Sequence, residues 1–393
     1  MIVRAAQRIR RKAATWALQR AARRLPSPPF EPDRVRKIGV PLYAGIGNIV
    51  LYGPALRAIR DRFADAELVA IVGNGRRNEE VLEPGLVDRV LECPLGPSAE
   101  HRRDDARRVR EERFDLCVNA FHFAQPEHAA LTVAAAIPWR CGHVTSPGWS
   151  SPYDVVYNLP AVMQRDQYEV DRYLELAYAL GIARGTVDET PRFHVTDAAR
   201  ERAIVALAER GVAPGTPILV VHAGTSEIMR WKQWGLDRFE AVVRRLVDET
   251  TATFVLVGAS DEHAEQLPMI ARLSETAPGR FVDLVGATDV PALGAVLERS
   301  LGLVGNDSGP MQIAVALGVP TVIPWGPSDH PRNAPRGPEH TILFKRLPCS
   351  PCYRMPGDSA VHLCGDRQCL KQIAVDEVAR AASERLLATV SRS

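Results

Sequence analysis

The residues best suited to chemistry lie in short loops that follow strand-like runs in the second half of the chain. An apolar run that starts at Leu303 ends at Gly305, and Asp307, Ser308 and Gly309 follow it at the start of an apolar helix. The first turn of a helix has backbone N–H groups without partners inside the helix, and these groups bind anions. We therefore expect Ser308 and Gly309 to hold an anion, with Asp307 beside it.

A second loop, HAGTSEIMRWKQW, places Thr225, Ser226 and Lys232 after another strand-like run. Hydroxyl groups hydrogen-bond phosphate oxygens, and a lysine ammonium neutralises their charge. A single loop lysine is more often only solvated. However, this loop, the GASDE loop and the GNDSGP loop all follow consecutive strand-like runs and would line one edge of a parallel sheet. Together they predict a site for a diphosphate and a ribose.

The elements that position these loops alternate between strand-like and helix-like segments, which predicts an α/β fold with parallel sheets. We expect a Rossmann-like domain over 34–195 and a second over 196–393, facing each other across a central cleft. The strand-like runs outside the GNDSGP segment are 37–43, 66–73, 87–94 and 114–121 in the first half, and 217–224, 252–260, 281–286 and 340–344 in the second.

Composition excludes several classes of protein. The chain has 393 residues, more than one hydrophobic core usually serves, and it has neither a 20-residue apolar run nor a signal peptide. A net charge of +2 gives no reason to propose nucleic acid as a partner, and no P-loop or G-x-S-x-G motif is present. We therefore expect a cytoplasmic protein.

The first 33 residues differ from the rest, because they carry Lys and Arg but no acid before Glu31. Ile2, Ile9, Ala13 and Trp16 recur at helical spacing, as in a basic amphipathic helix that binds anionic lipid on the inner face of the cytoplasmic membrane. Alternatively, the segment is a solvated tail, since its apolar face is mostly alanine.

Two further motifs leave alternatives open. Gly45 and Gly47 follow the first strand-like run, and they either approach a ligand or only permit a tight turn, because no dinucleotide fingerprint follows. A cysteine cluster with the spacing C-x2-C-x11-C-x4-C could hold a closed structural zinc or iron site, remain reduced, or form disulfides. Its members are Cys349, Cys352, Cys364 and Cys369.

From about residue 37 to its end the chain resembles the ADP-heptose:lipopolysaccharide heptosyltransferases of glycosyltransferase family 9. The resemblance lies in GIGNIVLYGPALRAIRDRFADAE, HAGTSEIMRWKQW, LVGNDSGPMQIAVALGVPTVIPWGPSD and the terminal CSPCY segment. It implies a GT-B fold, in which the second domain binds the nucleotide sugar and the first binds a lipid-linked or other glycan acceptor. It also implies inverting transfer that needs no metal or other cofactor for catalysis.

Carried onto this sequence, the resemblance makes Thr225 the donor-site threonine, Lys232 the phosphate-binding lysine and Asp307 an acid that orients sugar hydroxyls. Glu262 takes the place of the acid that binds the ribose of ADP-heptose. The helix that opens at Ser308 and Gly309 would then meet the diphosphate.

Two positions depart from the family pattern. Asn48 stands where the family has an aspartate that deprotonates the acceptor, and an amide cannot accept that proton, so the loop only positions the acceptor or another group is the base. The candidates for the base are His122, Glu127 and Asp171, although His122 could also be a strand-end histidine without chemistry. Gln312 replaces a histidine on the donor helix, where it could still form a hydrogen bond.

These residues predict a glycosyltransferase that moves a heptose or a related sugar to an acceptor hydroxyl in surface-glycan assembly. Two alternatives stay open at this point. One is a GT-B sugar-nucleotide epimerase, which would need no acceptor. The other is a sugar-nucleotide-binding protein without turnover, which the amide at Asn48 would permit.

Overall fold

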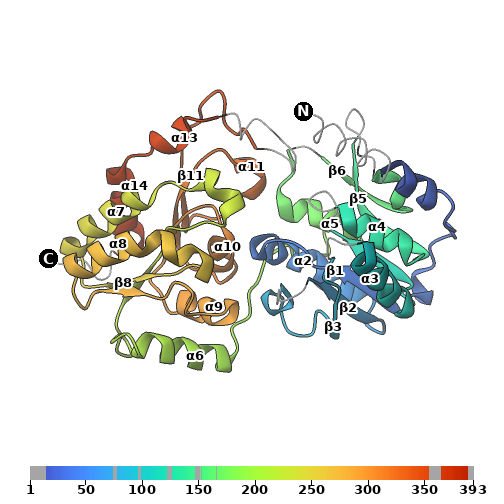
Figure 1. The fold of residues 1–393 in the computed structure, drawn as a ribbon, viewed down its shortest axis with the longest axis horizontal. Coiled ribbons are helices and arrows are strands. Elements are labelled where there is room, and N and C mark those ends of the chain that lie inside the picture. The colour runs from blue at the N-terminus through green and yellow to red at the C-terminus, as the bar shows by residue number, and fades with distance from the viewer. Residues whose placement is uncertain are drawn as a thin grey trace. The chain divides into compact units, whose positions relative to one another are not determined.

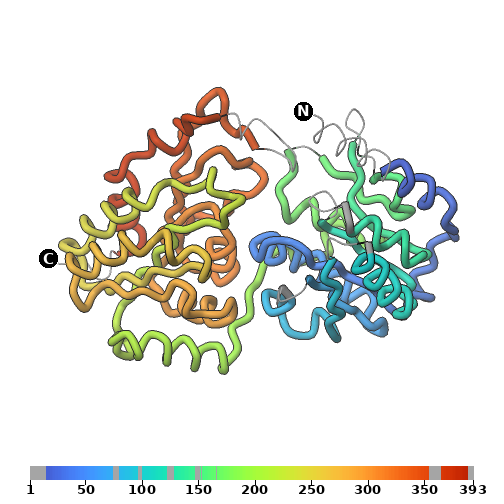
Figure 2. Tube along the Cα trace, in the orientation of Figure 1, coloured from blue at the N-terminus to red at the C-terminus, as the bar shows by residue number. Residues whose placement is uncertain are grey.

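The computed structural model describes residues 15–73, 78–95, 99–121, 126–146, 151, 153–164, 166–353 and 364–387. The chain divides into two compact units, Met1–Pro191 and Arg192–Ser393, each built around its own parallel sheet (Figure 1). The boundary lies in the polar stretch after α5 (Glu169–Ala179), and Figure 2 traces the chain through it to α6 (Asp197–Ala208).

The sheet of unit 1 has six parallel strands in the order β3-β2-β1-β4-β5-β6. The first four strand-like runs of the sequence correspond to β1–β4, whereas β5 and β6 were not expected. Arg140 and His143 interrupt the apolar pattern of β5, yet both are buried and hydrogen-bonded to backbone carbonyls. The strands are β1 (Lys37–Pro41), β2 (Glu67–Val72), β3 (Arg89–Glu92), β4 (Leu116–Asn119), β5 (Trp139–Thr145) and β6 (Leu159–Met163).

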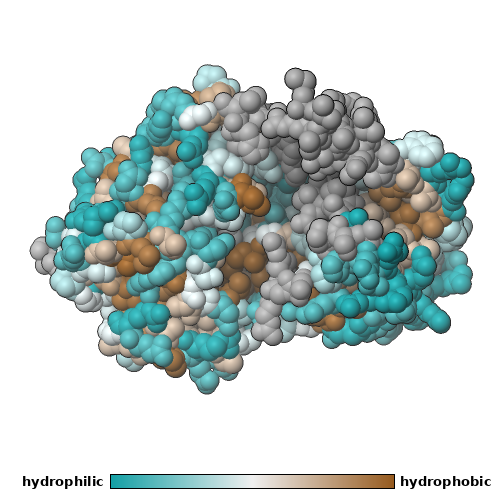
Figure 3. Space-filling model, viewed as in Figure 1, coloured by the Kyte–Doolittle hydropathy of each residue, from teal (hydrophilic) through white to brown (hydrophobic). Residues whose placement is uncertain are grey.

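Helices cover both faces of this sheet. On one face, α2 (Ile46–Arg62) packs against α5, and on the other, α3 (Ala99–Glu111) packs against α4 (Pro126–Ala134). Val109 anchors α3 in the core. The rest of α3 is rich in charged residues, and the surface in this part of the molecule is hydrophilic (Figure 3).

Part of the basic N-terminal segment packs on unit 1. Residues 15–22 are helical, and Leu18, Ala22 and Leu25 join a core cluster with residues of α4 and with Val156. The carbonyl of Pro29 accepts a hydrogen bond from the Trp139 indole, at 3.3 Å. The predicted apolar positions 2, 9 and 13 lie outside the described residues.

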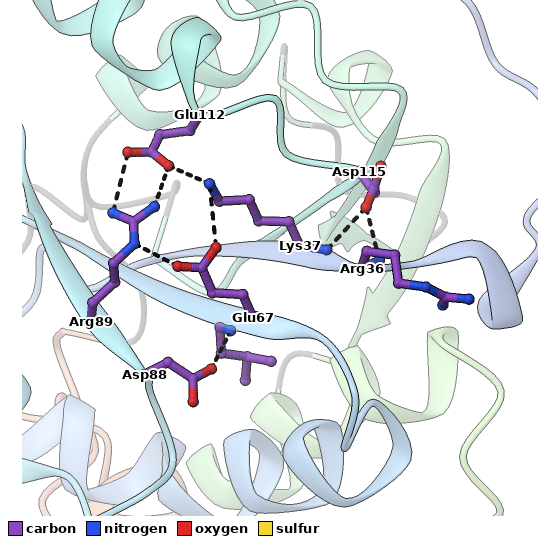
Figure 4. A network of polar contacts seen from close by, with 8 residues as sticks. Arg36, Lys37, Glu67, Asp88, Arg89, Glu112 and Asp115 are labelled. Atoms are coloured by element: carbon purple, nitrogen blue, oxygen red, sulfur yellow. Dashed lines mark hydrogen bonds and ion pairs between the residues drawn. The ribbon is translucent and has the colours of Figure 1, made fainter.

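A polar network holds the amino ends of β1, β2 and β3 together (Figure 4). Lys37 Nζ lies 2.6 Å from Glu112 Oε2 and 3.3 Å from Glu67 Oε2, and Arg89 contacts both carboxylates. The hydrogen bond from Arg89 lowers the pKa of Glu67. Because ligands of parallel sheets bind at the carboxyl ends of the strands, this network stabilises the sheet rather than a site.

Unit 2 repeats the same topology, with six parallel strands in the order β12-β11-β10-β7-β8-β9. In both sheets the first strand of the unit lies beside the fourth, which is the doubly wound Rossmann order and places a topological switch point between β7 and β10. All the strand-like runs of the second half are strands. They are β7 (Ile218–His222), β8 (Thr253–Leu256), β9 (Phe281–Asp283), β10 (Leu303–Gly305), β11 (Thr321–Trp325) and β12 (His340–Phe344).

The final helix completes the core of unit 2. α14 (Val375–Leu386) lies beside α7 (Leu236–Glu249), and both share a hydrophobic cluster with α8 (His263–Thr276) and α13 (Gln368–Lys371). α9 (Val290–Glu298) packs against α6 and against α10 (Gly309–Ala316), and α11 (His330–Asn333) follows β11. No helix in the described ranges is long and apolar enough to cross a membrane.

Candidate functional site

The candidate site of unit 2 lies at the carboxyl ends of β7, β8, β10 and β11, around the switch point. Contacts between the loops that follow these strands hold them together. One such contact depends on Gly224, because a Cβ there would come within 2.2 Å of Glu262 Oε2. A side chain at Gly224 would therefore displace the carboxylate that follows β8.

Lys232 and Asp307 form an ion pair at the centre of the site. Lys232 ends the short helix η4 (Glu227–Lys232), and its Nζ lies 2.8 Å from Asp307 Oδ2. The two side chains are only 16% and 7% exposed. Ser328, in the loop after β11, donates its hydroxyl to the same carboxylate oxygen. An ammonium has three N–H groups, so this contact leaves two of them without a hydrogen bond to the described residues.

Asn306 fixes the loop after β7, and sequence reasoning missed it. Its amide is fully buried and donates to the carbonyls of Ala223 and Gly224, at 2.9 and 3.1 Å. Its carbonyl oxygen accepts from the backbone N–H of Trp234 at 2.9 Å. A single side chain therefore ties both ends of the segment that carries Thr225 and Lys232.

Ser308 is the N-cap residue of α10, but its side chain makes no capping hydrogen bond. Its hydroxyl instead lies 3.0 Å from Nδ1 of His222, the last residue of β7. The other ring nitrogen of His222 lies 3.6 Å from Glu262 Oε2, in η5 (Ser260–Glu262). His222 is thus a buried link between two predicted donor-site residues, and nothing in the sequence pattern pointed to it.

Several polar groups at this edge have no hydrogen-bond partner in the part of the chain that the structure describes. The hydroxyl of Thr225 is buried without a hydrogen bond, and so are both amide atoms of Gln266 beside Glu262. Buried polar groups are normally hydrogen-bonded, so the Thr225 hydroxyl is an exception at this edge and is available to a ligand atom. Ser226 is exposed, and Gly309 forms the first residue of α10.

Gln312 does keep a hydrogen-bonding role. It lies on α10, is buried, and donates through Nε2 to the carbonyl of Asn333 at 3.0 Å. It thereby holds the end of α11 against α10.

In unit 1, α2, which carries Asn48, packs against α5, which carries Asp171. Gly45 is the N-cap of α2, and Gly47 and the exposed Asn48 lie in its first turn. Asp171 lies in the first turn of α5. His122 lies outside the described residues, and Glu127 is in the first turn of α4, where its side chain is not described.

Three aromatic rings join these elements. Tyr52 of α2, Phe121 after β4 and Tyr173 of α5 pack with ring centroids 5.4–5.6 Å apart. Each ring lies within four residues of Asn48, His122 or Asp171. Asn119, the last residue of β4, was not predicted from the sequence. It is fully buried, and neither of its amide atoms has a hydrogen-bond partner among the described residues.

The cysteine segment lies against the loops that follow β7 and β11. The backbone N–H groups of Cys352 and Tyr353 donate to the Pro327 carbonyl at 2.9 and 3.0 Å, next to Ser328. The Tyr353 ring contacts Trp231, with 4.8 Å between ring centroids. The segment therefore contacts Trp231, which precedes Lys232, and Pro327, which precedes Ser328.

The thiols of the cluster influence one another. All seven cysteines lie in the described residues and are free. Burial, together with the thiols of Cys349 and Cys364, raises the pKa of Cys352, and burial raises that of Cys369 to about 11. Among the described residues, however, no three His, Cys, Asp or Glu side chains are placed to hold a metal ion, so the metal site stays a prediction.

Known proteins are similar to this chain in sequence and in fold. Lipopolysaccharide heptosyltransferase 2 of Salmonella typhimurium is 25% identical over 297 residues, 72% of this chain and 80% of that protein. Lipopolysaccharide heptosyltransferase 2 of Escherichia coli is 26% identical over 255 residues, 62% of this chain and 69% of that protein. The structure of E. coli ADP-heptose lps heptosyltransferase II matches with a TM-score of 0.70 at 20% identity, over 89% of this chain and 98% of that chain.

These likenesses confirm the expected GT-B fold of two Rossmann-type units. The model of glycosyltransferase family 9 (heptosyltransferase) matches residues 102–360, which is more than half of the chain. This chain therefore belongs to glycosyltransferase family 9 and is a transferase.

Proposed function

We propose that this transferase moves a heptose from ADP-heptose to an acceptor hydroxyl during lipopolysaccharide assembly. The observation that carries the proposal is the edge of the unit 2 sheet, where the Lys232–Asp307 pair, the Ser308 helix end and the partnerless Thr225 hydroxyl lie on adjoining loops. Its family, and its likeness to two lipopolysaccharide heptosyltransferases, support the choice of sugar and acceptor.

The reaction is one displacement at the anomeric carbon of the sugar. The bond from this carbon to the acceptor oxygen forms as the bond to the diphosphate oxygen breaks, and the acceptor hydroxyl gives its proton to a base. Lys232, the Thr225 hydroxyl and the N–H groups at Ser308 and Gly309 stabilise the leaving diphosphate. Glu262 binds the ribose, and Asp307 orients sugar hydroxyls.

The base belongs to unit 1, and Asp171 is our candidate among the described residues. It lies in the first turn of α5, and the Tyr52–Phe121–Tyr173 contacts join that turn to α2, which carries Asn48. Asp171→Asn should nearly abolish transfer with ADP binding intact, whereas Asn48→Ala should retain it. Full transfer by Asp171→Asn would move the role of base to His122 or Glu127.

The proposed function is tested by incubating the purified chain with ADP-heptose and a heptose-deficient lipopolysaccharide acceptor. Release of ADP and an acceptor mass raised by one heptose support it. An epimerase would instead return an isomerised ADP-sugar without acceptor, visible by NMR. A binding protein would return unchanged ADP-heptose, and either result would overturn the proposal.

The four clustered cysteines fit a structural zinc or iron ion in their chemistry. We propose that Cys349, Cys352, Cys364 and Cys369 hold such an ion. Four thiolates would close its coordination, so the ion would order the segment against Pro327 and take no part in transfer.

We propose that the exposed side of the N-terminal helix binds anionic lipid, which would make the protein peripheral on the inner face of the cytoplasmic membrane. Trp16 is 61% exposed there, and Arg20, Arg23 and Arg24 are exposed beside it. Deleting residues 1–14 and changing Trp16 to Ala should reduce sedimentation with anionic vesicles. Equal sedimentation of the variant and the parent would support the solvated tail.

A further inference from the structure

His222 connects the two ends of the proposed nucleotide site. Its Nδ1 lies 3.0 Å from the Ser308 hydroxyl, which belongs to the diphosphate end, and its Nε2 lies 3.6 Å from Glu262, which belongs to the ribose end. The imidazole is 2% exposed, and its backbone is held against Gly305, where a Cβ would come within 3.0 Å of His222. The ring is therefore held by its hydrogen bond with Ser308, and its other nitrogen faces the Glu262 carboxylate.

A neutral imidazole cannot place its N–H toward Glu262 and also leave the Ser308 proton free for a diphosphate oxygen. It has one N–H, and that proton belongs on Nε2, because otherwise a lone pair would face the Glu262 carboxylate. Nδ1 is then an acceptor, so the Ser308 hydroxyl must donate its only proton to His222. In this state Ser308 presents lone pairs, rather than a proton, to any phosphate oxygen.

Protonation of His222 reverses the direction of this hydrogen bond. An imidazolium carries a proton on each nitrogen. Nδ1 then donates to Ser308, and the Nε2–H faces the Glu262 carboxylate at 3.6 Å, an electrostatic contact without a hydrogen bond. The Ser308 hydroxyl then has its proton free for a diphosphate oxygen. Charge-assisted bonds of this kind are the stronger ones.

The charges around His222 also favour its protonation when a nucleoside diphosphate binds. The positive charge of Lys232 is partly offset by its ion pair with Asp307, and Glu262 adds a negative charge, whereas a nucleoside diphosphate brings about three more at neutral pH. A proton on His222 offsets part of this repulsion. The other titratable groups on the adjoining elements are Arg230 paired with Glu265, His263 paired with Asp283, the exposed Glu227 and Asp261, and the buried Asp329.

We propose that His222 takes up one proton from solvent when a nucleoside diphosphate binds, and that the imidazolium orients the Ser308 hydroxyl toward a diphosphate oxygen. This inference rests on the proposed placement of the diphosphate at Ser308. His222 is a positioning residue, because it acts on the ligand through Ser308. It also couples the ribose end of the site to the phosphate end.

Calorimetric titration with ADP tests the proposal. At pH 7.5, where the terminal phosphate of ADP is already ionised, the binding heat should vary with the ionisation enthalpy of the buffer, with a slope approaching one proton taken up per ADP. ADP affinity should fall up to about tenfold per pH unit above neutrality. His222→Gln should bind ADP more weakly, with a heat that no longer depends on the buffer.

Matched variants separate the outcomes. His263→Gln, at a neighbouring histidine that pairs with Asp283, should keep the proton uptake. Ser308→Ala should lose most of it while still binding ADP, and this variant decides the matter if His222→Gln does not fold. ADP binding by the parent without proton uptake, or uptake that survives in both His222→Gln and Ser308→Ala, would overturn the inference alone. Failure of the folded parent to bind ADP would overturn the proposed function as well.

Discussion

At the scale of single residues, Lys232 carries the charge that meets the diphosphate. Lys232→Ala should weaken ADP binding by about 1.5–3 kcal/mol, or roughly 10- to 150-fold in Kd, because a charge-assisted hydrogen bond is lost. Lys345→Ala is the matched control, since this lysine also forms a half-buried ion pair, 2.6 Å from Glu377, on another strand end of unit 2. Equal affinity of the Lys232 variant and the parent would remove Lys232 from the site.

Substitution of Asp307 should affect turnover and ADP binding differently, because its carboxylate pairs with Lys232 and is proposed to hold the sugar. Asp307→Asn removes the negative charge 2.8 Å from the ammonium, so ADP should bind at least as tightly as in the parent. Transfer should fall by roughly tenfold or more, a loss of about 1.4 kcal/mol of transition-state stabilisation. Titration with ADP and initial rates measure the two effects, and parallel losses in both would contradict the role.

The sequence was informative about residues whose position follows directly from a strand end. Thr225, Lys232, Asp307 and Ser308 were found in this way, and the structure places their loops together. His222, Asn306 and Ser328 were not found, because their contacts join loops that are far apart in the sequence. A histidine at the end of a strand looks like a core residue until the serine 86 positions later is seen beside it.

At the scale of elements, apolar runs predicted ten of the twelve strands found in the described residues, and the other two show where the pattern fails. β5 buries an arginine and a histidine, and β6 alternates buried and exposed residues around a proline. The burial of Arg140 depends on carbonyls at Ile137 and Val156, which only the folded chain supplies. The hydrophobic periodicity of a sequence does not show such hydrogen bonds, so it does not predict a strand that buries polar side chains.

The cysteine segment should respond to metal as a unit. If the proposed ion is bound, protein purified without added metal should contain about one zinc or iron per chain. Cys352→Ser should lower both the metal content and the melting temperature. It should also weaken ADP binding a few-fold, because the segment braces Pro327 beside Ser328, which hydrogen-bonds Asp307.

A cysteine outside the cluster provides the control for this prediction. Cys93→Ala changes a buried thiol of unit 1, so it should lower the melting temperature without changing the metal content. Elemental analysis showing far less than one equivalent in the parent, with the cluster thiols titrating freely, would contradict the metal site.

At the scale of the whole molecule, unit 1 should lose stability as the pH falls below about 6.5. Burial lowers the pKa of His128 to about 3 and, together with Arg172, lowers that of His143 to about 4. An unfolded histidine has a pKa of about 6.5, so the unfolded chain takes up protons between pH 6.5 and 4 that the native unit does not. Each histidine should then reduce the free energy of unfolding by up to about 1.4 kcal/mol per pH unit.

Urea unfolding at a series of pH values measures this effect, and hydrogen exchange of β4 and β5 assigns it to unit 1. Comparing variants between pH 6.5 and 5 isolates the histidine, because carboxylates with lowered pKa, such as Glu67 and Glu112, begin to matter only at lower pH. Asp105, whose pKa is raised by burial, is present in every variant and contributes equally to each slope. His143→Gln should reduce the slope of unfolding free energy against pH by up to one proton. His101→Gln, at an exposed position of α3, should leave the slope unchanged. A slope that is the same in both variants and the parent would mean that His143 is protonated in the native unit.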